Sequence, residues 1–146
     1  MVPILCGSFY EFIANGGNPA EDEKISRFID TLREATTGKK VLAVASVDLA
    51  HVGPNFGDDF VIDEARQTAL RESDRDLMEA IALGDAERFY YKVAAVDDRN
   101  RICGFSSIYL MLRYLGQTMG TEIAYEHCPA DAQDQSFVSI CGILLK

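Results

Sequence analysis

The sequence predicts an α/β domain in which helices are layered on both faces of a mixed sheet, an αβα arrangement. The main observation is the run Val41–Val47, which is apolar, rich in β-branched residues and of the length typical of a strand covered on both faces. A second apolar run, Met1–Gly7, precedes it, and a helical pattern separates the two. This strand, helix, strand order resembles the start of a parallel βαβ unit. We expect one domain over residues 1–146.

The first third of the chain contains the elements of this unit. Met1–Gly7 is closed by a glycine and is predicted to be a buried strand. Residues 9–19 contain a Gly-Gly pair and an Asn-Pro step, so a loop is expected there. From Ala20, three acidic residues precede apolar positions with helical spacing, which predicts a helix ending at Gly38.

The remaining elements follow a loop that breaks all periodicity, Asp48–Phe60. Ligand sites in open α/β sheets lie in loops at the carboxyl ends of strands, so this loop is the first place to look for a site. The pattern over residues 61–96 predicts two helices divided near Gly84-Asp85. A polar turn and a third helix follow, and two strands, Thr121–Cys128 and Phe137–Leu145, end the chain.

Composition excludes several classes of partner. The chain has 14 Lys+Arg against 23 Asp+Glu and a formal net charge of -9, without the basic stripe that nucleic acids or anionic membranes require. No run approaches the ~20 apolar residues of a membrane span, and there is no secretory signal pattern. The four cysteines form no CxxC pair and are expected to be reduced thiols. We therefore expect a cytoplasmic protein.

The most reactive-looking pair is Asp48 with His51. A carboxylate three residues before an imidazole in a strand-end loop can orient or charge it, which suits proton transfer. The alternative is structural: Asp48 caps the loop and His51 packs against Phe56 or Phe60. Spacing alone gives these two interpretations about equal weight.

Cys103 is the second candidate, because it lies between a polar turn and a buried helix. A thiol at a helix N-terminus is favoured as thiolate and is then a good ligand for iron or copper. The alternative is core packing beside Gly104. His127 and Cys128 are adjacent on a strand and point to opposite faces, so structural or surface roles are expected for both. The acidic pairs Asp58-Asp59 and Asp97-Asp98 are interpreted as ordinary loops.

Together these segments resemble one family. The run VASVDLAHVGPNF, Val44–Phe56, is similar to the diagnostic segment of the Memo-like family, also called protein B of the AmmeMemoRadiSam system. Arg101–Gly104 resembles its Cys-Gly step, and Tyr125 with Asp134–Val138 resembles its terminal hairpin. The opening Pro3–Gly7 resembles the strand that begins the second half of a usual member, which is about twice this length.

The resemblance implies a fold like that of the catalytic subunits of class III extradiol dioxygenases, which are metal-dependent oxidoreductases with non-haem iron. It implies a metal site formed by two histidines of the N-terminal half and by Cys103, with Asp48 and His51 lining the same cavity. Those two histidines have no counterpart in this chain. Phe105–Ser107 also replaces the polar lining common in relatives.

Three interpretations of function remain open. The chain is a metal-binding redox protein whose iron or copper site is incomplete until the N-terminal half supplies further ligands. Alternatively, it is a non-catalytic adaptor that binds a peptide or small molecule around Asp48, His51 and Cys103. As a third interpretation, it is a half-domain completed by homo-oligomerisation or by a partner chain, because a half-sheet exposes an edge and an apolar face.

Overall fold

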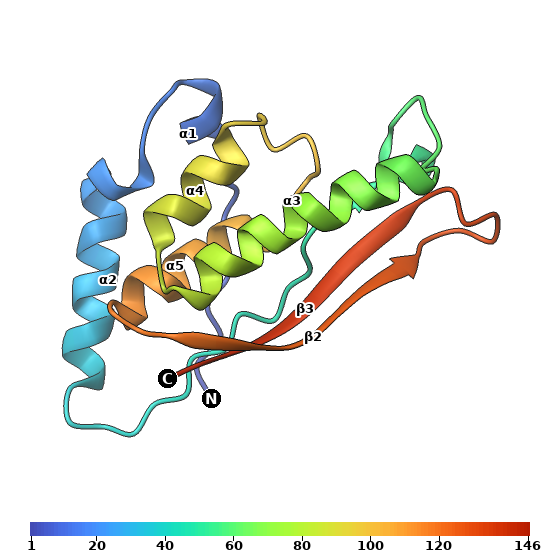
Figure 1. Cartoon of the computed structure of the whole chain (residues 1–146). Coiled ribbons are helices and arrows are strands. Elements are labelled where there is room, and N and C mark those ends of the chain that lie inside the picture. The colour runs from blue at the N-terminus through green and yellow to red at the C-terminus, as the bar shows by residue number, and fades with distance from the viewer.

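The computed structural model describes residues 1–146 and has a layered α/β fold, as the sequence predicts (Figure 1). Five α-helices accompany a three-stranded antiparallel sheet in the order β1-β3-β2. The helices are α1 (Tyr10–Ala14), α2 (Glu23–Thr36), α3 (Glu64–Ala82), α4 (Ala86–Ala94) and α5 (Phe105–Leu115), and the strands are β1 (His51–Val52), β2 (Gly120–Pro129) and β3 (Phe137–Leu145). No helix combines the length and apolar character needed to cross a bilayer.

The sheet is built around the long hairpin of β2 and β3. Its register pairs Thr121 with Leu144 and Pro129 with Phe137, and one irregularity lies between Glu122 and Ala124. The third strand, β1, adds only two residues to the other edge of β3. Figure 1 shows α3 lying along one face of this hairpin.

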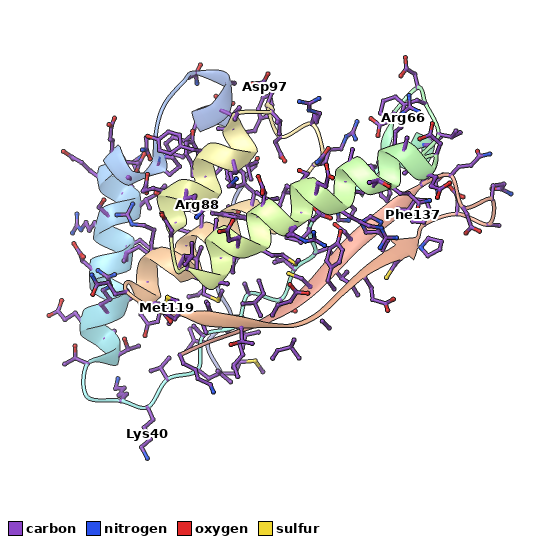
Figure 2. All side chains as sticks on the ribbon, viewed as in Figure 1. Lys40, Arg66, Arg88, Asp97, Met119 and Phe137 are labelled. Carbon is purple, nitrogen blue, oxygen red and sulfur yellow. The ribbon has the colours of Figure 1, made fainter.

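The core lies where the helices meet this face. Phe89 of α4 and Tyr109 and Leu112 of α5 are almost completely buried. Phe9, just before α1, packs its ring edge-on against Tyr109 with the centroids 5.5 Å apart, and so fixes the N-terminal segment beside α5. Phe137, labelled in Figure 2, buries the start of β3 against the same cluster.

Side-chain caps fix the starts of the longer helices. Asp22, Asp63 and Asp85 each accept a hydrogen bond from a backbone N–H in the first turn of α2, α3 and α4 respectively. A carboxylate at this position satisfies an otherwise unpaired donor and interacts favourably with the helix dipole. The predicted division near Gly84-Asp85 is therefore confirmed.

Two predicted strands are wrong in this structure. Met1–Gly7 and Val41–Val47 are not strands, and the residues from 40 to 48 donate no backbone hydrogen bond. Leu42 is 83% exposed and Val44 is 72% exposed. The physical reason is that a strand exists only beside a neighbouring strand, and no other segment of the chain pairs with either run. The expected parallel βαβ opening is accordingly absent.

Two smaller predictions also differ. Residues 9–19, expected to be a loop, contain the short helix α1. The Asp48–Phe60 loop contains β1 at His51–Val52, which is too short for a period-two pattern to be visible in the sequence.

Candidate functional site

The three predicted site residues lie close together along the backbone. The Cys103 N–H donates to the Leu49 carbonyl at 3.0 Å, and the Gly104 N–H donates to the Asp48 carbonyl at 2.8 Å. On its other side this segment is bonded to β3, where the Leu49 N–H donates to the Ser139 carbonyl at 2.9 Å. The start of α5 and the centre of β3 therefore hold the Asp48–His51 segment between them. We call this region the polar corner, defined by Asp48, His51 and Cys103.

Gly104 makes this close approach possible. A Cβ atom at this position would lie 2.6 Å from Cγ2 of Val47 and 2.8 Å from the carbonyl oxygen of Asp48. Carbon atoms do not approach so closely without displacing their neighbours. The Cys-Gly step therefore has a steric function, because only glycine lets α5 start against the Asp48 backbone.

His51 interacts both with Asp48 and with an aromatic ring. Its Nε2 atom is 3.8 Å from Oδ2 of Asp48, its Nδ1 atom is 3.2 Å from the Leu49 carbonyl oxygen, and its ring packs edge-on against Phe56 with the centroids 5.0 Å apart. The carbonyl favours a proton on Nδ1, which leaves Nε2 as an acceptor facing the carboxylate side. Elements of both interpretations of this pair are thus present, and the assignment of a catalytic role stays a prediction.

Cys103 is exposed and lines a cavity of about 370 Å³. The N-terminal segment forms the opposite wall, with Cys6, Ser8 and Phe9, and the turn before α5 contributes Arg101. Asp48 and His51 do not line this cavity. The backbone therefore brings the three predicted residues together, while the thiol and the imidazole face different parts of the surface.

Arg101 is a residue that the sequence interpretation missed. Its guanidinium donates to both carboxylate oxygens of Asp58, at 2.7 and 3.2 Å, and to the His51 carbonyl oxygen at 3.3 Å. The hydrogen bond from Arg101 holds the pKa of Asp58 below its ordinary value, although burial opposes this. Asp58 also accepts from the Gly53 N–H at 2.7 Å. Asp58 lies in a loop, as expected, and in addition it connects the loop after β1 to the turn before Cys103.

The turn that carries Arg101 is held by a second carboxylate. Asp98 accepts a hydrogen bond from the Ile102 N–H at 2.8 Å, and burial raises the pKa of this carboxyl. Arg101 itself has a φ of 50°, in the left-handed region that costs energy for a residue with a side chain. These contacts stabilise that conformation. No local sequence motif predicts the contact between Asp58 and Arg101, because the two residues are 43 positions apart.

A metal ion would need more ligands than this corner provides. No group of three or more His, Cys, Asp or Glu side chains is arranged to hold one. Open iron sites use about three protein ligands, whereas here one exposed thiol and one imidazole face different surfaces. The ligand set of this chain alone therefore does not fit the iron or copper centre that the resemblance implies.

A second polar cluster is buried between α3 and the hairpin. The Tyr125 hydroxyl donates to Oδ2 of Asp74 at 2.7 Å and lies 2.6 Å from Nε2 of His127. Asp74 is fully buried, and the His127 side chain is 2% exposed. We call Asp74, Tyr125 and His127 the buried triad. The strand pattern indicates a structural or surface role for His127, and the structure makes it a member of this interior network.

Burial perturbs the titration of the whole triad. It raises the pKa of Asp74, while the hydrogen bond from Tyr125 opposes the shift. Burial likewise raises the pKa of the Tyr125 hydroxyl and lowers that of His127, which the positive charge of Arg71 lowers further. Oδ1 of Asp74 and Nδ1 of His127 have no hydrogen-bond partner. Unsatisfied buried polar atoms are rare, and this pair marks the triad as unusual.

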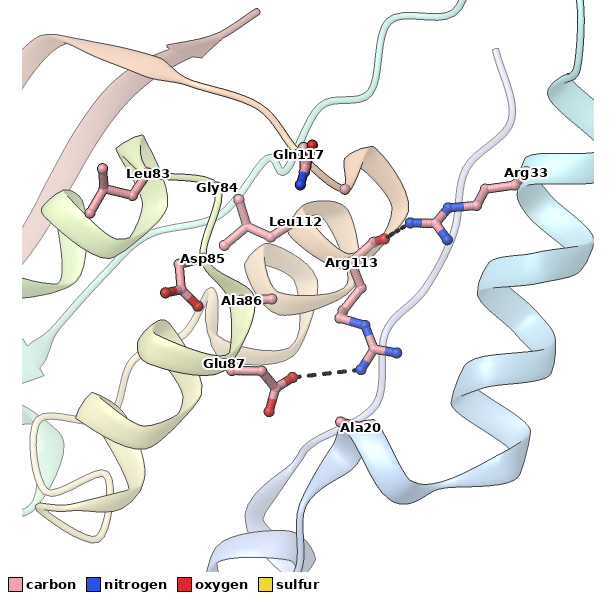
Figure 3. Close-up of a pocket in the computed structure, with 11 residues that line it drawn as sticks. Ala20, Arg33, Leu83, Gly84, Asp85, Ala86, Glu87, Leu112, Arg113 and Gln117 are labelled. Atoms are coloured by element: carbon pink, nitrogen blue, oxygen red, sulfur yellow. Dashed lines mark hydrogen bonds and ion pairs between the residues drawn. The ribbon is translucent and has the colours of Figure 1, made fainter.

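A more open pocket of about 570 Å³ lies at the other end of the helices, between α2, α4 and α5 (Figure 3). Its charged side chains are already paired. Arg113 lies 3.6 Å from Glu87, and Arg33 donates to the backbone carbonyls of Arg113 and Tyr114. Because these charges bind one another, the pocket is a less suitable ligand site than the polar corner.

Comparison with known proteins settles the family. The family model for Memo-like protein matches residues 16–144, which include the polar corner, Gly104 and the buried triad. The chain belongs to the Memo-like family. No curated protein matches this Memo-like chain. The resemblance recognised in the sequence is thereby confirmed, while the role of each site residue and the metal stay predictions.

Proposed function

We propose that this Memo-like protein works as a two-fold dimer in which a second copy covers Val41–Val47 and completes the polar corner. The observation that carries the proposal is the contrast between the sequence of this run and its surroundings. Seven residues suited to a sheet interior lead directly to Asp48, yet Leu42 is 83% exposed. The N–H groups of the run donate no hydrogen bond and Val41, Leu42 and Val44 are exposed, which favours pairing with a strand of another chain.

The charges that flank the run favour a second copy as the partner. Antiparallel pairing of two copies centred on Val44 places Val41 opposite Val47 and Lys40 opposite Asp48. The run itself has no charged residue, so no like charges face each other within the paired segment. Figure 2 shows Lys40 extending away from the bend after α2, and Lys40 forms no ion pair within the chain. Opposite charges facing each other across strands each contribute about 0.2–1 kcal/mol.

In this dimer the polar corner contains groups from both copies. The ammonium of Lys40 from the second copy lies beside Asp48, whose carboxylate is 3.8 Å from the His51 imidazole. This carboxylate stabilises the imidazolium that forms when Nε2 takes up a proton, and the Cys103 thiol lies one hydrogen-bonded backbone segment away. The proposed function is therefore acid–base chemistry on a small ligand bound at the corner, with activity dependent on dimerisation.

Sedimentation velocity at concentrations well above micromolar tests the proposal. We expect a dimer for the natural chain and a monomer for Leu42→Lys, which places a charge in the paired strand. Leu83→Lys is the matched control, because Leu83 is also exposed, at 41%, but lies at the end of α3. A natural chain that stays monomeric, or a Leu42→Lys chain that still dimerises, would contradict the proposal.

A charge exchange tests the register. Lys40→Asp and Asp48→Lys should each weaken the dimer, by about tenfold in Kd, because both symmetry-related pairs then become repulsive. The double variant restores opposite charges and should recover the affinity. Failure of the double variant to recover would exclude this register even if a dimer forms.

A further inference from the structure

The buried triad of Asp74, Tyr125 and His127 has no part in the dimer contact, although its chemistry is that of a functional site. A network with only a structural role normally satisfies all of its polar atoms, because each unsatisfied buried atom costs stability. Here two members keep one unsatisfied atom each, Oδ1 of Asp74 and Nδ1 of His127. The triad is also next to β3, the strand that is hydrogen-bonded to the Asp48–His51 segment of the polar corner.

The geometry of the triad allows one added proton to move between its two ends. The Tyr125 oxygen is 2.7 Å from Oδ2 of Asp74 and 2.6 Å from Nε2 of His127. In one arrangement, the His127 imidazolium donates to the Tyr125 oxygen and the Tyr125 hydroxyl donates to the Asp74 carboxylate. When the Tyr125 proton moves to Oδ2 and the Nε2 proton moves to Tyr125, the result is a neutral imidazole and a carboxylic acid. The same two contacts serve both arrangements.

Ser139 connects this triad to the polar corner. It lies in β3, where it pairs with His127 of β2 in the strand register. On the opposite side its hydroxyl accepts a hydrogen bond from the Ala50 N–H at 2.9 Å, and its own N–H donates to the Ala50 carbonyl at 3.0 Å. Directly paired residues of neighbouring strands project to the same face of the sheet, so Ser139 lies beside the His127 member of the triad. Ala50 immediately precedes His51, so one residue contacts both the triad and the corner.

We infer that the buried triad is a proton-sharing relay that positions His51 through Ser139 and Ala50, so that the proton occupancy of the triad changes the environment of the His51 imidazole. This makes Asp74, Tyr125 and His127 positioning residues for the polar corner. The inference rests on the proposed function, because it assigns a support to the same corner. It requires no second copy, since every contact in the relay lies within one chain.

The charged and titratable groups around the triad come from α3 and β3, and Glu122 of β2 acts on the Cys141 thiol. Arg71 and Asp74 face it from α3, and their opposite charges act on His127 in opposite directions. Cys141 of β3 is the third group. Burial raises the pKa of its thiol to about 11, and the negative charge of Asp74 adds to this shift. At physiological pH this thiol carries no charge, so the proton of the relay is shared among the three triad members.

Imidazole NMR gives a direct test, because the chain has two histidines and therefore two sets of ring signals. His127→Gln identifies which set belongs to His51. In the natural chain we expect the His51 ring shift to change with pH at the same inflection as the His127 ring shift. In His127→Gln this inflection of the His51 shift should vanish. A His51 shift that shows no inflection in common with His127 would overturn the inference.

The reactivity of Cys103 gives a second readout. Alkylation by iodoacetamide is followed on the tryptic peptide of residues 102–113, in which Cys103 is the single cysteine. Tyr125→Phe removes the shared hydroxyl and keeps the ring, and it should change the Cys103 rate by about twofold or more, within the range of such couplings. The matched control is Tyr91→Phe, because the Tyr91 hydroxyl is exposed and accepts from Asn18, and not from a member of the triad. Equal rates in folded Tyr125→Phe and in the natural chain would also overturn the inference.

These outcomes are distinguishable from failure of the proposed function. The monomeric Leu42→Lys chain should keep the inflection that the His51 shift shares with His127, because the relay is contained in one chain. A natural chain that does not dimerise but shows the shared inflection contradicts the dimer alone. A dimer whose His51 shift lacks the shared inflection contradicts the relay alone.

Discussion

Gly104→Ala should destabilise the protein through one steric contact. The added Cβ would lie 2.6 Å from Cγ2 of Val47, 2.7 Å from Cδ1 of Ile108 and 2.8 Å from the carbonyl oxygen of Asp48. The Val47 and Ile108 methyl groups can rotate away, whereas the Asp48 carbonyl belongs to the backbone and is bonded to the Gly104 N–H at 2.8 Å. The substitution must therefore move the Asp48 segment away from the start of α5.

The magnitude follows from two opposing effects. Overpacking a close contact costs about 1–3 kcal/mol, and replacing glycine by alanine recovers about 0.4–1 kcal/mol by restricting the unfolded chain. Gly104 has a φ of -75°, which alanine adopts freely, so no backbone strain is added. We expect a net loss of about 1–2 kcal/mol in the free energy of unfolding.

Urea denaturation followed by circular dichroism measures this loss. Gly142→Ala is the matched control, because a Cβ there meets no atom closer than 3.8 Å. It should leave the stability unchanged or slightly higher. Gly104→Ala should also change the alkylation rate of Cys103, since the two backbone bonds to Leu49 and Asp48 are disturbed together. If Gly104→Ala is as stable as Gly142→Ala, the steric reasoning is refuted.

Two further predictions concern charges. Burial lowers the pKa of His127 in the folded chain, so as the pH falls the unfolded chain takes up this proton at a higher pH than the folded chain does. The free energy of unfolding should therefore fall as the pH drops below 6.5, by at most about 1.4 kcal/mol per pH unit. Urea titrations across this pH range should show that His127→Gln removes this part of the fall, and a fall that His51→Gln removes instead would contradict the assignment. Asp58→Asn should lower the free energy of unfolding by about 1 kcal/mol, because it breaks the paired hydrogen bonds between Arg101 and the Asp58 carboxylate, whose side chain is only 11% exposed. Asp63→Asn, at an exposed ion pair where asparagine still caps α3, should change stability less, and an equal loss in both variants would argue against a special role for Asp58.

The helices could be predicted from the sequence because their signals are local. The carboxylate at Asp85 after Gly84 marks a helix start that the structure has at Ala86. The apolar spacing from residue 102 onward likewise indicates α5, which begins at Phe105. Such patterns involve residues within about four positions of each other, so a helix can be predicted from them without knowledge of the rest of the chain.

The strands were harder to predict because their partners are distant. Val41–Val47 has the composition of a buried strand, yet its burial depends on a neighbour that this chain does not place beside it. The same limit applies to the site. Asp48, His51 and Cys103 could be selected by residue type and order, whereas the contact of Asp58 with Arg101 and that of Asp74 with Tyr125 depend on the folded topology.

Hydrogen–deuterium exchange over Val41–Val47 tests the central claim, that a second copy pairs with this run. In the single chain no N–H of this run donates a hydrogen bond, so exchange of a monomer should be fast. At concentrations well above the dissociation constant of the dimer we expect slow exchange across the run, which becomes fast on dilution and in Leu42→Lys. Fast exchange at every concentration would contradict the claim.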